Sequence, residues 1–127
     1  DPLMDYLLSF RERMNHAREL LTDEGQTAFF FVTLAEALPI AVIGRFIGWF
    51  REFGIPVGGV IVNMLLDPEQ AKADAPEFVR NRVAMQSRYL EEITQKFDGM
   101  VRATAPLFDS EVRGIDSLRE LAGALFR

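Results

Sequence analysis

The chain has 127 residues, of which 49% are hydrophobic and 26% charged, and its formal net charge is −5. This length and composition fit one folded unit over residues 1–127 and exclude a disordered chain. The negative charge opposes contact with nucleic-acid phosphates, so no nucleic-acid partner is expected. Because cysteine is absent, the chain can hold no disulfide, no thiolate metal site and no cysteine nucleophile.

An amphipathic helix is predicted over about residues 3–21. Its apolar residues recur at spacings of three and four, with polar residues between them: Leu3, Leu7, Phe10, Met14, Ala17 and Leu21. Gly25 can adopt the left-handed conformation that closes a helix, so the helix should end just before it. The chain opens at Asp1 without a signal peptide, and we expect the natural protein to begin upstream.

A strand, a helix and a second strand are predicted next. Residues 29–33 are a continuous apolar run, the pattern of a strand covered on both faces in a parallel sheet. Pro39 suits the first turn of a helix, because its missing N–H would be unpaired there, and Gly54 marks the end of that helix. Gly58 and Gly59 should then turn the chain into a second apolar strand over residues 60–63.

The apolar stretch of residues 27–50 is long enough to cross a bilayer. Glu36 and Arg45 would each cost about 2.5 to 3.5 kcal/mol at the bilayer centre, and Pro39 would fall inside the span. A buried strand followed by a largely buried helix explains the stretch at lower cost. We therefore expect a cytoplasmic protein.

The second half continues the alternation of strands and helices. A polar loop over residues 67–76 precedes a long helix, whose apolar face carries Val79, Val83, Leu90, Ile93 and Phe97. A weaker strand follows over residues 99–106, and Ser117 with Glu120 has the capping-box spacing that opens a last helix. The order predicts an α/β fold with about three strands of a doubly wound, mainly parallel sheet flanked by helices.

No catalytic residue or metal ligand is expected within the chain. Nucleotide hydrolysis on such a sheet needs a Gly-rich loop with a Lys against the phosphates. Neither Lys72 nor Lys96, the only two lysines, follows a strand-to-glycine turn. His16 is the only histidine and lies on the polar side of the first predicted helix, so neither a histidine-based triad nor a multi-histidine metal site can be built.

Asn63 ends the second predicted strand, and open α/β sheets bind ligands at the carboxyl ends of their strands. Its amide offers an acceptor and two donors that match the edge of adenine. Alternatively, Asn63 only caps or turns the chain. The third strand ends at the same edge, where Pro106, Leu107 and Phe108 could supply a second wall for a planar ring.

Five segments, in order, resemble the C-terminal part of the arsenite-pump and tail-anchored-protein-targeting ATPases. They are residues 18–23 (RELLTD), 31–36 (FVTLAE), 53–63 (FGIPVGGVIVN), 85–93 (MQSRYLEEI) and 106–114 (PLFDSEVRG). The resemblance covers nearly the whole chain. It implies a deviant P-loop ATPase that uses ATP and Mg²⁺ and works as a homodimer. The P-loop and the Mg²⁺ ligands would lie upstream, so this segment alone should be inactive.

In that family the residue matching Asn63 recognises adenine, and the loop matching Pro106, Leu107 and Phe108 lines the base. The resemblance therefore implies the adenine-binding side of an ATP-hydrolysing transport or targeting ATPase. Residues 1–24 resemble the end of the family's helical subdomain, which handles cargo. Implied partners are a membrane transporter subunit or a membrane-protein cargo, with the protein peripheral to the membrane through that partner. The alternative is a non-catalytic interaction module derived from the fold.

Two departures from the family pattern matter. The zinc-binding cysteines of the targeting members would fall at Pro76 and Val79, so that zinc site is not encoded here. The helix after the first strand is unusually apolar, which predicts a subunit contact along Val42, Phe46 and Trp49. A half-sheet should also expose a strand edge and apolar surface that the rest of a larger domain would cover.

Overall fold

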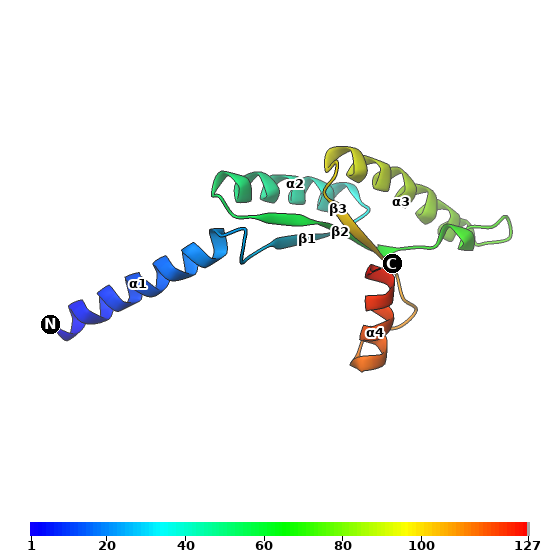
Figure 1. Cartoon of the computed structure of the whole chain (residues 1–127). Coiled ribbons are helices and arrows are strands. Elements are labelled where there is room, and N and C mark those ends of the chain that lie inside the picture. The colour runs from blue at the N-terminus through cyan, green and yellow to red at the C-terminus, as the bar shows by residue number, and fades with distance from the viewer. Residues whose placement is uncertain (127) are drawn as a thin grey trace.

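A computed structural model describes residues 1–126 (Figure 1). Helices and strands alternate along them: α1 (Pro2–Thr22), β1 (Phe29–Leu34), α2 (Ala37–Glu52), β2 (Val57–Leu65), the short 3-10 helix η1 (Pro68–Gln70), α3 (Glu77–Lys96), β3 (Val101–Pro106) and α4 (Gly114–Leu125). The strands form one parallel sheet in the order β1-β2-β3, with β2 in the middle. The predicted α/β fold with a parallel sheet flanked by helices is confirmed.

The core lies between the sheet and the two crossover helices. α2 and α3 cover the same face of the sheet (Figure 1). α2 contributes Ile40, Ile43 and Ile47, whose spacing of three and four places them on one side of the helix, and they pack with Val60 and Val62 of β2. Each fully buried aliphatic side chain of this size contributes about 1.5 to 3 kcal/mol. This packed layer holds α2 against the sheet.

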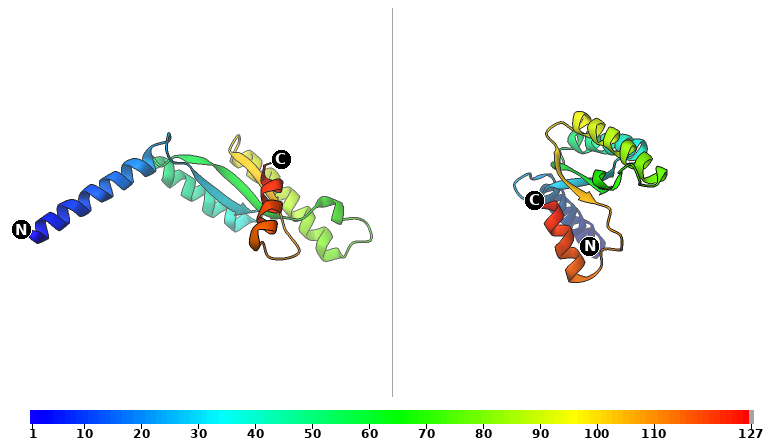
Figure 2. Two further views of the ribbon diagram at one scale, coloured as in Figure 1. Left: turned by 60° about the horizontal axis from the view of Figure 1, so that its bottom comes forward. Right: turned by 90° about the vertical axis from the view of Figure 1, so that its right-hand side faces the viewer.

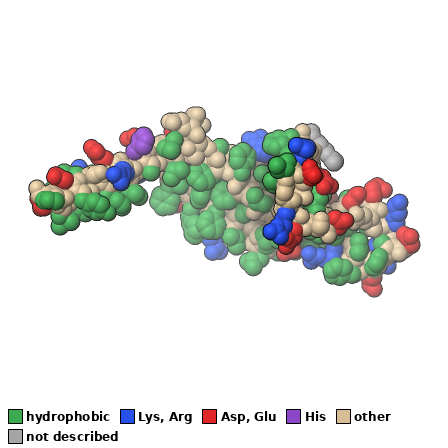
Figure 3. All heavy atoms as spheres, turned by 90° about the horizontal axis from the view of Figure 1, so that it is seen from below, with side chains coloured by type: hydrophobic (Ala, Val, Ile, Leu, Met, Phe, Trp, Pro, Cys, Tyr) green, Lys and Arg blue, Asp and Glu red, His purple; other side chains and the backbone are tan. Residues whose placement is uncertain are grey.

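The opposite face of the sheet is mostly bare. Thr33 of β1 is buried, whereas its neighbour Val32 is 58% exposed and Phe30 is 53% exposed. The prediction that this strand is covered on both faces is therefore wrong within this chain. α4 lies on this side, but it contacts β3 and leaves β1 uncovered. Seen from below Figure 1, hydrophobic side chains gather across the middle of the molecule (Figure 3).

α1 is a regular helix whose side chains lie outside the hydrophobic core of the described chain. It projects away from the sheet (Figure 2), and none of its residues is buried. The stripe that predicted the helix from its spacing is exposed, including Leu3, Phe10 and Met14. His16 is exposed too. The shape is elongated, with residues 29–126 forming the packed part.

Two predicted helix caps differ from the structure. Gly25 does not close α1: Asp23 ends it with an extended backbone, and its carboxylate accepts hydrogen bonds from Gln26 Nε2 (2.7 Å) and Gly25 N (2.8 Å). These two bonds, that from Gln26 first, lower the pKa of Asp23. α4 begins at Gly114, which has a left-handed φ of 80°, so Ser117 lies inside the helix rather than capping it. Gly54, in contrast, follows α2 with the expected left-handed φ of 71°.

Gly58 and Gly59 lie inside β2 rather than before it. Gly59 has a φ of 152°, and a Cβ there would stand 2.7 Å from the carbonyl oxygen of Met100 and collide with Arg102 Cγ. That carbonyl accepts a hydrogen bond from Val60 N (2.8 Å), so β3 approaches β2 closely at this point. Only glycine leaves room for the approach.

None of the helices within residues 1–126 combines the length and apolar character needed to cross a bilayer.

Candidate functional site

The carboxyl ends of all three strands meet at one edge of the sheet. Leu34 of β1 is in register with Asn63 of β2, and Leu65 of β2 with Pro106 of β3. Leu107 N then donates a hydrogen bond to the carbonyl oxygen of Leu65 (2.9 Å), which attaches the segment after β3 to the end of β2. In an open parallel sheet this is the edge where ligands bind.

Asn63 occupies the middle strand at this edge. Val62 points into the core, so the alternation of a strand places Asn63 on the opposite face, away from α2 and α3. The side chain is half-buried. Among the side-chain hydrogen bonds formed within residues 1–126, none involves its amide. A capping asparagine would use its amide in a local hydrogen bond, and Asn63 forms none of this kind within those residues.

The residue after Asn63 has an unusual backbone. Met64 has a left-handed φ of 58°, and the register with β3 slips between Val62 and Leu65, as in a β-bulge. A non-glycine residue in this conformation costs about 1 to 3 kcal/mol, and the surroundings must hold it in place. Such strain gathers at functional sites, and here it lies at the carboxyl edge of the sheet.

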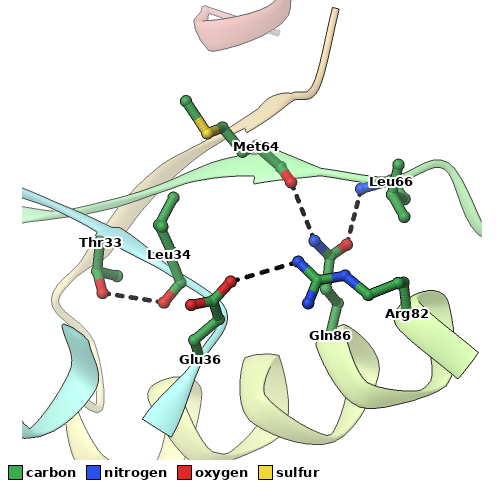
Figure 4. A network of polar contacts seen from close by, with 7 residues as sticks. All are labelled: Thr33, Leu34, Glu36, Met64, Leu66, Arg82 and Gln86. Carbon is green, nitrogen blue, oxygen red and sulfur yellow. Dashed lines mark hydrogen bonds and ion pairs between the residues drawn. The ribbon is translucent and has the colours of Figure 1, made fainter. Parts of the chain in front are cut away.

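Gln86 of α3 holds this backbone (Figure 4). Its side chain is nearly buried, at 9% exposed. Its Nε2 donates to the carbonyl oxygen of Met64 (3.0 Å), and its Oε1 accepts from Leu66 N (2.8 Å). Gln86 lies between Val83 and Leu90 on the core-facing side of the helix. A polar residue in an otherwise apolar stripe is a signal that the sequence contained, although its partners, 20 and 22 residues away, were not readable.

A second contact joins the same edge to α3. Arg82 Nη2 lies 3.3 Å from Glu36 Oε1, at the start of α2 (Figure 4). Both side chains are 40% exposed, so the pair contributes at most about 1 kcal/mol. Together, the Gln86 and Arg82 contacts tie α3 to the ends of β2 and β1.

The main hollow of the described chain lies beside this edge. It has a volume of about 750 Å³ and runs along β3 between α3 and α4, with Gln86, Leu90, Pro106 and Leu125 among its walls. Asn63 does not line it. Phe108 lines a separate hollow of about 20 Å³ with residues of α4 and the loop before it. The structure therefore brings the predicted residues to one edge without enclosing them in one cavity.

No three His, Asp or Glu side chains within residues 1–126 are grouped so as to hold a metal ion. The predicted site residues at the carboxyl edge of the sheet are instead the amide of Asn63 and the apolar residues after β3. An amide and apolar side chains suit a planar, hydrogen-bonding ring better than a phosphate.

A parallel sheet with crossover helices defines an open α/β protein, a class in which ligands bind at the carboxyl edge of the sheet. A family model described as anion-transporting ATPase matches residues 1–127, and the chain belongs to this family.

Named relatives agree with the family match. The chain is 30% identical over 125 residues to ATPase GET3B of Arabidopsis thaliana, which covers 97% of this chain and 30% of that protein. It is also 30% identical over 125 residues to ATPase get3 of Aspergillus niger, covering 98% and 36%. ATPase ASNA1 homolog 2 of Paramecium tetraurelia is 24% identical over 119 residues, covering 94% and 35%. The chain thus spans about a third of the length of these relatives.

Proposed function

We propose that this chain supplies the adenine-binding side of an ATP-hydrolysing transport or targeting ATPase. The observation that carries the proposal is Asn63, which lies two residues before the end of the middle strand at the ligand-binding edge and whose amide forms no side-chain hydrogen bond within residues 1–126. Membership of an ATPase family supports the same assignment. Pro106, Leu107 and Phe108, attached to β2 through Leu65, would form the apolar wall beside the base.

The residues of this chain would bind the base of ATP, and residues in other parts of the protein would bind its phosphates. Asn63 Oδ1 would accept from the exocyclic amine of adenine, while Nδ2 would donate to a ring nitrogen. ATP brings Mg²⁺ and phosphates that need a Gly-rich loop and a hydroxyl ligand, and these groups would come from other parts of the protein. The chain by itself is then inactive as a hydrolase.

The proposal extends to partners and location. The protein would act as a homodimer on the cytoplasmic side of a membrane, serving either a membrane transporter subunit or a membrane-protein cargo. Val42, Phe46 and Trp49 of α2 support a subunit contact, because each is more than 40% exposed although apolar. Phe46 and Trp49 stack edge to face with ring centres 5.3 Å apart, which makes a firm apolar ridge.

Calorimetric titration of the longest natural reading frame with a non-hydrolysable ATP analogue tests the assignment. Asn63→Ala should weaken binding by about 1 to 3 kcal/mol, the range for one bidentate base contact. Asn81→Ala, an exposed asparagine on α3, is the matched control and should bind like the parent. Unchanged affinity in Asn63→Ala would remove Asn63 from the site. A parent that binds no nucleotide would favour a non-catalytic interaction module instead.

A further inference from the structure

Two side-chain amides lie near the end of β2: that of Asn63 in the strand itself and that of Gln86 in α3. Within residues 1–126 the Asn63 amide forms no side-chain hydrogen bond, whereas both polar atoms of the Gln86 amide are engaged by the backbone of residues 64 and 66. These two hydrogen bonds bracket Leu65, whose carbonyl oxygen in turn accepts from Leu107 N. Gln86 therefore holds the backbone around Leu65. Asn63 precedes this backbone in β2, and residues 106–108 are attached to it through Leu107.

The conformation that Gln86 holds is one that Met64 would not adopt unaided. A left-handed φ at a non-glycine residue is disfavoured, and relaxation of Met64 to an extended backbone would remove the bulge. Because a slip of one residue in a strand turns its side chains to the other face, losing the bulge would change how β2 leaves the sheet. Asn63 and Met64 are the two residues within the register slip of β2 against β3, and Leu65 is the first residue after it.

We infer that Gln86 is a positioning residue for base recognition, which rests on the proposed function of Asn63. Gln86 touches no base itself. It maintains the left-handed Met64 bulge, and the bulge presents the Asn63 amide and holds residues 106–108 at a fixed distance from it. The consequence is specificity: without Gln86, the protein discriminates less well between adenine and guanine nucleotides.

The test is the ratio of affinities for non-hydrolysable ATP and GTP analogues in the full-length protein. Gln86→Leu keeps the size of the side chain and removes both hydrogen bonds. It should lower the ATP preference at least about fivefold, the lower end of what one lost bidentate base contact produces. Gln95→Leu is the matched control, since Gln95 is exposed on α3, and it should keep the ratio of the parent.

A rescue separates positioning from a general loss of stability. Glycine adopts a left-handed φ without strain, so Met64→Gly added to Gln86→Leu should restore most of the ATP preference. Met64→Val works in the opposite direction: a β-branched residue resists this conformation, and the side chain it replaces is 48% exposed, so core packing is spared. Met64→Val should therefore lower the ATP preference with Gln86 intact.

The outcomes are distinguishable. A folded Gln86→Leu protein with the parent's ratio would overturn the inference, as would a folded Met64→Val protein with that ratio if Gln86→Leu fails to fold. If Asn63→Ala weakens binding in the same experiments, the proposed function stands although the inference about Gln86 fails. If the parent binds no ATP analogue, or Asn63→Ala binds as the parent does, the proposed function fails first and the inference fails with it.

Discussion

Single residues at the carboxyl edge show how far a side chain can be interpreted from sequence. Asn63 was proposed as a site residue because the sequence predicted that an apolar strand ends there, and strand ends in parallel sheets are where ligands bind; the strand runs on to Leu65, and the role of Asn63 stays a prediction. Met64 and Gln86 were not proposed, because a left-handed methionine and two hydrogen bonds across 20 and 22 residues depend on tertiary structure. Gly59 was misplaced for the same reason: its neighbour Arg102 comes from another strand.

Gly59→Ala should destabilise the protein by about 1 to 3 kcal/mol, because its φ is disfavoured for alanine and the added methyl group would meet the Met100 carbonyl. Denaturant-induced unfolding measures the change. Gly48→Ala is the control on α2, where nothing lies within 4 Å of an added Cβ, and it should stabilise by up to about 1 kcal/mol. Equal effects at the two glycines would contradict the close approach of β3 to β2.

At the scale of elements, periodicity gave the type of each helix and strand correctly but not what covers it. The run Phe29–Val32 is apolar on both faces, which fits a fully covered strand, yet α2 and α3 cover only one face in this chain. The spacing of apolar residues predicts which face of an element is hydrophobic. It does not predict which other element packs against that face. The same holds for α1, whose stripe predicted the helix and remains exposed.

Phe46→Ala should weaken self-association of the full-length protein, because Phe46 lies in the exposed ridge of α2 with Val42 and Trp49. Sedimentation velocity in the presence of nucleotide should show a shift from dimer towards monomer. Phe78→Ala removes an aromatic ring from α3 that is also highly exposed, and it should leave the dimer intact. A parent that stays strictly monomeric with nucleotide bound would rule out the contact.

At the scale of the whole molecule, the described residues form a three-stranded sheet with two open edges. β1 and β3 are both edges within the described residues, and the face opposite α2 and α3 is largely apolar and uncovered. The sequence predicted such an exposed edge and surface from the resemblance to part of a larger domain. It could not predict that α1 would extend away from the sheet, since an amphipathic stripe does not specify where the helix docks.

The isolated chain should therefore associate in solution and bind a hydrophobic dye, because unpaired strand edges and bare apolar surface favour both. The longest natural reading frame should show much less dye fluorescence at equal concentration. Sedimentation of the isolated chain is the measurement. A monodisperse monomer without dye binding would mean that the exposed face needs no cover.

The most direct test of the adenine assignment is photolabelling of the full-length protein with 8-azido-ATP, followed by mass spectrometry of its peptides. We predict label in the segments around Asn63 or residues 106–108, protection by excess ATP, and loss of most of that label in Asn63→Ala but not in Asn81→Ala. Label that excess ATP displaces but that lies wholly outside these two segments would contradict the assignment of the base to this chain.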